Sequence, residues 1–68
     1  MKTYQCLLHT TSCFTPFTVR SSSPLGARRK ALKVARVKVH KRTVEDEGVD
    51  YLTKDGRRLW VSSKEAKL

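Results

Sequence analysis

The strongest pattern of apolar and polar positions consists of two short apolar runs that flank Asp55-Gly56. Asp-Gly between β-type runs predicts a hairpin, because both central residues of a type I′ turn need a positive φ. A two-residue loop at Asp55-Gly56 pairs Leu52 with Leu59, and it also pairs Tyr51 with Trp60. One face of the predicted hairpin therefore carries Leu52, Leu59 and Val61, and the other carries Val49, Tyr51 and Trp60.

A second β-type pattern lies upstream, where Val37 and Val39 alternate with basic residues. β-branched residues at a period of two favour a strand, so we predict a strand at about 33–40. Residues 27–32 are expected to form a short helix or coil, and a basic helix through this region is the alternative. The strand covers one face of the hairpin and leaves the other face for an external partner.

Two further segments carry local signals. Glu45, Asp46 and Glu47 precede Gly48, which predicts an acidic turn that faces solvent. Residues 62–65, Ser-Ser-Lys-Glu, match a capping box and predict at most one helical turn near the C-terminal end.

The N-terminal part differs in composition. Residues 1–23 are rich in Ser and Thr and contain no acid, and Arg20 precedes three Ser. Such a segment is typical of an organellar transit peptide, and a flexible arm is the alternative. Tyr4, Leu7 and Leu8 suit one face of a short helix that Pro16 would end. With Pro24-Leu25-Gly26 as a loop, residues 1–26 form a transit peptide or extension and residues 27–68 a small β ribbon.

The charge is uneven along the 68 residues, whose formal net charge is +9. No Asp or Glu occurs before Glu45, whereas Lys and Arg are dense in residues 28–42. A dense basic stretch favours a polyanionic partner. Chains below roughly 70–80 residues rarely gain more than about 3–5 kcal/mol from their core, so nucleic acid is also the expected source of stability.

Metal, membrane and catalytic roles find little support. Cys6, His9 and Cys13 lack a fourth ligand nearby, so we expect no metal site. No apolar run approaches the 18 or so residues of a membrane span. Nothing resembles a nucleophile with its base, paired catalytic carboxylates or a phosphate-binding glycine loop, so we expect neither an enzyme nor a cofactor or small-molecule substrate.

Residues 32–68 resemble the smallest protein of the bacterial-type large ribosomal subunit, protein thirty-six of that series. Leu32-Lys33-Val34 is similar to the start of that family, Lys54-Asp55-Gly56-Arg57 to its hairpin tip, and Trp60-Val61 to its returning strand. The resemblance implies a small three-stranded antiparallel ribbon-like sheet, here with a basic, extended N-terminal arm, that binds rRNA.

The chain departs from that family at its zinc ligands. Ser62 stands where the third Cys belongs and Leu68 where the His belongs. The first Cys pair falls near residues 42–48, which hold Thr43, Glu45 and Asp46 instead. The resemblance therefore implies a zinc-less ribbon held by its surroundings, as a mitochondrial ribosome would provide.

The resulting hypothesis is a structural constituent of an organellar large ribosomal subunit in the mitochondrial matrix, with rRNA and neighbouring ribosomal proteins as partners. Tyr51 or Trp60 would stack on a splayed base, and core packing is the alternative for Trp60. The alternatives for the whole chain are a stand-alone nucleic-acid-binding module and a small subunit of a mitochondrial membrane complex. The expected RNA-binding residues are Arg28, Arg29, Lys30, Lys33, Arg36, Lys38, Lys41, Arg42, Lys54, Arg57, Arg58 and Trp60.

Overall fold

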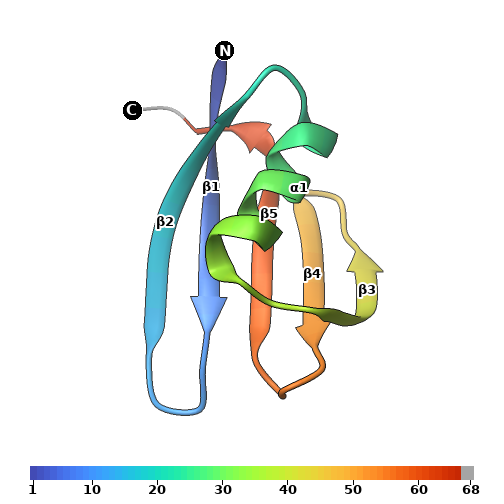
Figure 1. Cartoon of the computed structure of the whole chain (residues 1–68). Coiled ribbons are helices and arrows are strands. Elements are labelled where there is room, and N and C mark those ends of the chain that lie inside the picture. Colours follow the sequence, from blue (N-terminus) through green and yellow to red (C-terminus); the bar gives the residue numbers. More distant parts are fainter. Residues whose placement is uncertain (67–68) are drawn as a thin grey trace.

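The computed structural model describes residues 1–66, which form one antiparallel sheet and one helix (Figure 1). The elements are β1 (Lys2–His9), β2 (Phe14–Ser21), α1 (Pro24–Ala35), β3 (Val39–Val44), β4 (Gly48–Thr53) and β5 (Arg58–Glu65). The strand order across the five-stranded sheet is β2-β1-β5-β4-β3. A small antiparallel β fold is thus confirmed, but the predicted three-stranded ribbon with an extended arm is wrong.

The difference arises in the N-terminal region, which forms strands. Tyr4 and Leu7 lie on opposite faces of β1, so the predicted short helix does not form. Pro16 is tolerated because β2 is an edge strand, where a missing N–H breaks no ladder. Cys6 pairs with Phe17 on one side and with Val61 on the other, and its side chain is fully buried.

Helix α1 begins and ends with recognisable caps. Ser23 Oγ accepts a hydrogen bond from Gly26 N at 3.2 Å, and Pro24 occupies the first turn, where its missing N–H costs nothing. Arg36 adopts the left-handed conformation at φ 54° and ends the helix. The helix therefore takes residues 33–35 of the predicted strand at 33–40, and β3 starts only at Val39.

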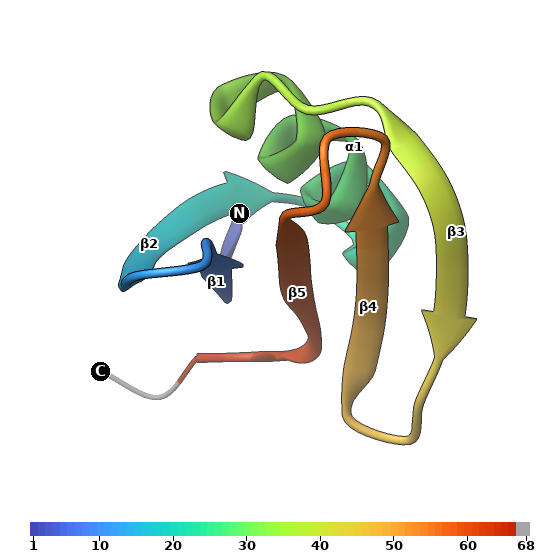
Figure 2. The ribbon, with the colours of Figure 1, turned by 90° about the horizontal axis from the view of Figure 1, so that it is seen from below.

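The helix lies on one face of the curved sheet (Figure 2) and packs on β1, β2 and β5. Ala27 and Ala31 face the sheet, and their small side chains let the helix approach closely. The buried apolar side chains of the core between helix and sheet come from both halves of the chain: Tyr4, Cys6, Val19, Ala27, Ala31, Val49, Tyr51, Leu59 and Val61. The core is larger than expected because β1 and β2 contribute to it.

The β4–β5 hairpin forms where Asp55-Gly56 predicts one, but with a different loop. Thr53 N donates to Arg57 O at 2.9 Å, which leaves a three-residue loop with Gly56 at φ 90°. The register pairs Tyr51 with Leu59, one residue away from the predicted pairing. Because a one-residue slip moves every side chain to the other face, Leu52 and Trp60 lie on the open face and not in the core.

The acidic turn is confirmed, and the C-terminal helical turn is not. Glu45 N donates to Gly48 O at 2.8 Å, and Glu45, Asp46 and Glu47 are exposed at the β3–β4 turn. Residues 62–65 belong to β5. The capping-box prediction fails because this segment continues the ladder with β4 and β1.

Candidate nucleic-acid interface

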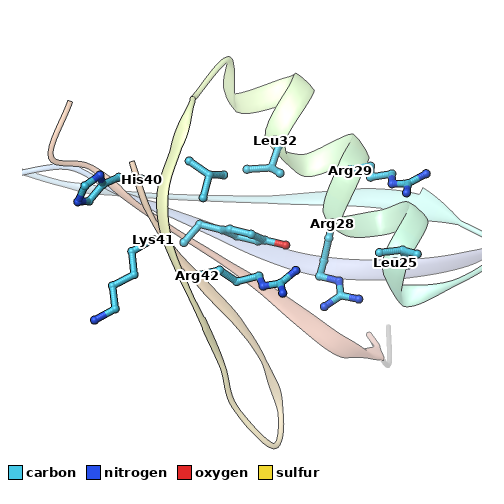
Figure 3. A pocket seen from close by; sticks show the side chains of 9 residues that line it. Leu25, Arg28, Arg29, Leu32, His40, Lys41 and Arg42 are labelled. Carbon is cyan, nitrogen blue, oxygen red and sulfur yellow. The ribbon is translucent and has the colours of Figure 1, made fainter. Parts of the chain in front are cut away.

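A groove of about 580 Å³ separates α1 from the edge strand β3 (Figure 3). It exists because the helix packs on β1, β2 and β5 and leaves the β3–β4 side of the sheet beside it. Its lining is Leu25, Arg28, Arg29 and Leu32 from α1, Val39, His40, Lys41 and Arg42 from β3, and Tyr51 from β4. The groove therefore joins an apolar floor to basic walls.

A bulge in β3 turns one of these basic side chains toward the helix. Val39 pairs with Thr53 and Lys41 with Leu52, so His40 is the extra residue. The bulge reverses the alternation that follows it, and Arg42 comes opposite the buried Tyr51, on the helix-covered face. Figure 3 shows Arg42 extending toward Arg28, whereas His40 and Lys41 project from the outer side of β3.

The groove has unused hydrogen-bonding capacity. Arg28 Nε is buried, and within residues 1–66 it has no hydrogen-bond partner. A buried donor without a partner costs free energy until a ligand or water supplies an acceptor. A guanidinium offers its donors in a fork that matches the oxygens of a phosphate.

The electrostatics of the groove are those of an anion site. No Asp or Glu of the described residues lines it. Three of the six acids, Glu45, Asp46 and Glu47, instead lie at the β3–β4 turn. The single ion pair found in residues 1–66 joins Asp55 to Arg57 at 2.7 Å. The basic side chains of the groove thus repel one another in the folded protein, and a bound polyanion would relieve that repulsion.

The other predicted basic residues are spread over three places. Lys30 and Lys33 are exposed on α1, where Lys30 Nζ donates to the carbonyl of Arg20. Arg36, Lys38 and Lys54 line a smaller hollow of about 230 Å³, together with Val37 and Asp55. This second basic hollow lies where the end of α1 meets the β4–β5 turn, since Lys54 N donates to Lys38 O at 2.9 Å.

Arg57 and Arg58 have different surroundings. Arg57 Nε donates to Asp55 Oδ2 at 2.8 Å, and this hydrogen bond holds the pKa of the Asp55 carboxyl well below its usual range. The charge of Arg57 is therefore largely offset. Arg58 and Trp60 lie on the face of the sheet opposite α1, so the groove does not include them.

Sequence reasoning found Arg28, Arg29 and Arg42 but not that their side chains meet in one groove, and it did not predict that Lys41 would project from the outer side of β3. It missed the apolar lining from Leu25, Leu32 and Val39. A usable signal was present: Ser23-Pro24 is an N-cap followed by Pro, which marks the start of a helix over the basic run.

Other kinds of site have little basis in the described part of the chain. Residues 1–66 contain no group of three or more His, Cys, Asp or Glu side chains placed to hold a metal ion. Leu68, which the family resemblance puts at a ligand position, lies outside the described residues. Among the described residues no helix is both long and apolar enough to cross a membrane. Comparisons with family models, with curated proteins and with solved structures gave no match.

Proposed function

We propose that this protein is an RNA-binding module that holds a phosphate backbone in the groove between α1 and β3. One observation carries the proposal: Arg28 of α1 and Arg42 of β3 converge in a groove that no Asp or Glu of the described residues lines. Within this groove Arg28 Nε has no hydrogen-bond partner among residues 1–66. Phosphate oxygens supply the acceptors and the negative charge that this arrangement lacks.

The proposal predicts a salt-dependent affinity. If Arg28, Arg29 and Arg42 each neutralise one phosphate, the slope of log affinity against log salt should be roughly −2 to −2.7. Fluorescence anisotropy with a labelled RNA of about 20 nucleotides, titrated at several salt concentrations, measures this slope.

A matched pair of double variants locates the contact. Arg28→Ala/Arg42→Ala removes two charges from the groove, and Lys2→Ala/Lys64→Ala removes two exposed charges outside it. The groove variant should lower the magnitude of the slope by about 1.5, whereas the control should change it by less than half as much. Equal effects of the two variants would mean that binding is a property of net charge alone, and the groove would lose its role.

We propose the finer assignment, an rRNA-bound constituent of a mitochondrial large ribosomal subunit with ribosomal protein neighbours, on narrower support. The residues similar to the hairpin tip of that family, Lys54 to Arg57, do form the β4–β5 turn. Leu32-Lys33-Val34, by contrast, lies in α1, so this part of the resemblance adds nothing. Co-sedimentation with the large subunit in high salt, lost after ribonuclease treatment, is the expected result.

A stand-alone nucleic-acid-binding module is the second candidate, and the core favours it. Tyr4, Leu59 and Val61 are buried within this chain, so the fold does not need an assembly to supply its core. If the isolated protein is folded, monomeric and binds RNA but never sediments with ribosomal subunits, the stand-alone module is the correct candidate.

A further inference from the structure

The sheet face opposite α1 carries side chains in two rows that cross the strands. The register places Pro16, Leu7, Trp60 and Asp50 side by side in the first row. The second row is Phe14, His9, Arg58, Leu52 and Lys41. Aromatic and basic side chains thus gather on a face that no other element within residues 1–66 covers, and the groove beside α1 is on the other face.

The two rows enclose a hollow of about 180 Å³ between aromatic rings. It is lined by Leu7, His9, Phe14, Asp50, Arg58 and Trp60. The rings of His9 and Phe14 have their centroids 3.7 Å apart, and Phe14 is 61% exposed. These rings are not part of the buried core, so their contact with each other leaves ring faces available to a ligand.

Trp60 forms the opposite wall of the hollow, and Gly48 fixes its position. A Cβ at Gly48 would lie 2.8 Å from Trp60 Cε2 and 2.5 Å from Val61 O, so the indole rests directly against the glycine. An aromatic wall that is already held in place loses little conformational entropy when a flat ligand packs on it.

We propose that this hollow binds a nucleobase of a single-stranded nucleic acid, an inference that rests on the proposed RNA-binding function. A base is flat and uncharged, and it can stack on the indole or on the His9–Phe14 pair. Arg58, at the edge of the hollow, suits the phosphate that accompanies the base, and the Asp50 carboxylate can accept a hydrogen bond from an exocyclic amino group.

The composition of the hollow favours a base over a cationic side chain. Arg58 is part of its lining, so an incoming Lys or Arg would meet a like charge. The acids Glu45, Asp46 and Glu47 border Trp60 from the opposite side, around a separate hollow of about 540 Å³. These acids repel phosphates from the β3–β4 side of Trp60, so the backbone of the nucleic acid should run toward Arg58.

The only Trp of the chain reports binding directly. Trp60 fluorescence should be quenched when oligo(dC) of 12 nucleotides is added, and a duplex of the same length should quench far less because its bases are paired. Phe14→Ala should reduce the affinity for the single strand by several fold, whereas Thr18→Ala, an exposed change on the same face outside the hollow, should leave it unchanged.

Trp60 itself is tested by fluorescence anisotropy of a labelled strand. Trp60→Ala should weaken binding by roughly tenfold or more, and Trp60→Phe, which keeps a ring, should lose much less. Circular dichroism of each variant shows whether the sheet is retained. A Trp60→Phe protein that is folded but binds no better than folded Trp60→Ala would contradict a stacking role.

The outcomes separate this inference from the proposed function. If oligonucleotides bind with the expected salt slope but leave Trp60 fluorescence unchanged, the base site is wrong and the groove proposal stands. If no nucleic acid binds, the proposed function fails and the base site fails with it. Quenching by oligo-lysine and not by oligo(dC) would also overturn the base site, in favour of a cationic peptide.

Discussion

Tyr51 lies directly opposite Leu59 across the β4–β5 hairpin, and both side chains point into the core beneath α1. The three-residue loop sets this pairing. Gly56, at φ 90°, occupies the left-handed position that such a loop requires, and no atom lies within 4 Å of where its Cβ would be. The loop length thus decides whether Leu59 or Trp60 is buried.

Deleting Lys54 tests whether the core depends on this pairing rather than on the third loop residue. Without Lys54, Asp55-Gly56 closes a two-residue loop between Thr53 and Arg57, so Tyr51 still pairs with Leu59 and both side chains stay in the core. We therefore expect the deletion variant to keep a cooperative thermal transition in circular dichroism. Lys54→Ala is the control: the side chain is exposed, and its loss should change the melting temperature by no more than a few degrees. A deletion variant without a cooperative transition would show that the pairing requires the three-residue loop.

The same hairpin shows which of its features can be predicted from the sequence. Asp55-Gly56 predicts a turn correctly, but Asp-Gly fits both a two-residue and a three-residue loop. The choice is made by burial, because only the longer loop places Val49, Tyr51, Leu59 and Val61 on one face. That information is tertiary and is not contained in the turn itself.

The N-terminal strands were missed for a different reason. Their abundant Ser and Thr residues and their lack of acids are typical of a transit peptide, but Thr is also a good strand residue. Tyr4, Cys6 and Leu8 alternate at a period of two, which is a strand signal within the segment. For the candidate site, the basic residues could be found from composition, whereas the groove could not, because it depends on the bulge at His40 and the position of α1.

Residues 1–21 should be indispensable for the fold, since β1 lies between β2 and β5. Removing residues 1–26 should abolish the thermal transition. Tyr4→Ala should destabilise the full chain by about 3 kcal/mol or more, because Tyr4 is 2% exposed and its loss leaves a cavity. Lys2→Ala, an exposed change in the same strand, should cost less than about 0.5 kcal/mol. Chemical denaturation of the two point variants measures both values.

The five-stranded sheet bears on the transit-peptide hypothesis, because β1 and β2 lie within the predicted transit segment. A fusion that carries residues 1–26 should enter mitochondria, as the composition predicts. Cleavage within that segment would remove core side chains such as Cys6 and Val19, so the folded protein in the organelle should retain them. N-terminal sequencing of the imported full chain checks this, and a mature form that begins near residue 24 yet remains folded would contradict the five-stranded sheet.

The two thiols should differ sharply in reactivity. Cys13 is exposed in the β1–β2 connection, whereas burial raises the pKa of the Cys6 thiol to about 11. A disulfide reagent at pH 8 should modify one thiol of the native protein at once and the second only at the rate of unfolding. Cys13→Ser should remove the fast phase. Rapid modification of both thiols would show that β1 is not held in the sheet.

Because burial raises the pKa of the Cys6 thiol, the protein should become less stable at high pH. The folded state keeps the proton more tightly than the unfolded state, whose thiol ionises near its ordinary value of 9.0. The contribution of the protonated Cys6 thiol to the free energy of unfolding is therefore complete below about pH 9 and is lost as pH rises toward about 11. Melting temperatures should fall across this window more steeply for the native sequence than for Cys6→Ala, and equal slopes would contradict the assignment.

Asp50 should give the proposed base site a preference for cytosine over thymine. Its carboxylate lies beside Trp60 in the hollow and only accepts hydrogen bonds, so cytosine, which presents an amino donor, should bind better than thymine, which presents a carbonyl at the same position. We expect oligo(dC) to bind several fold more tightly than oligo(dT). Asp50→Asn offers both a donor and an acceptor and should reduce this ratio toward one. Thr43→Ala, an exposed change on β3 directly opposite Asp50, should preserve it. Fluorescence anisotropy with both oligonucleotides provides the ratio, and a ratio that Asp50→Asn leaves unchanged would show that Asp50 does not contact the base.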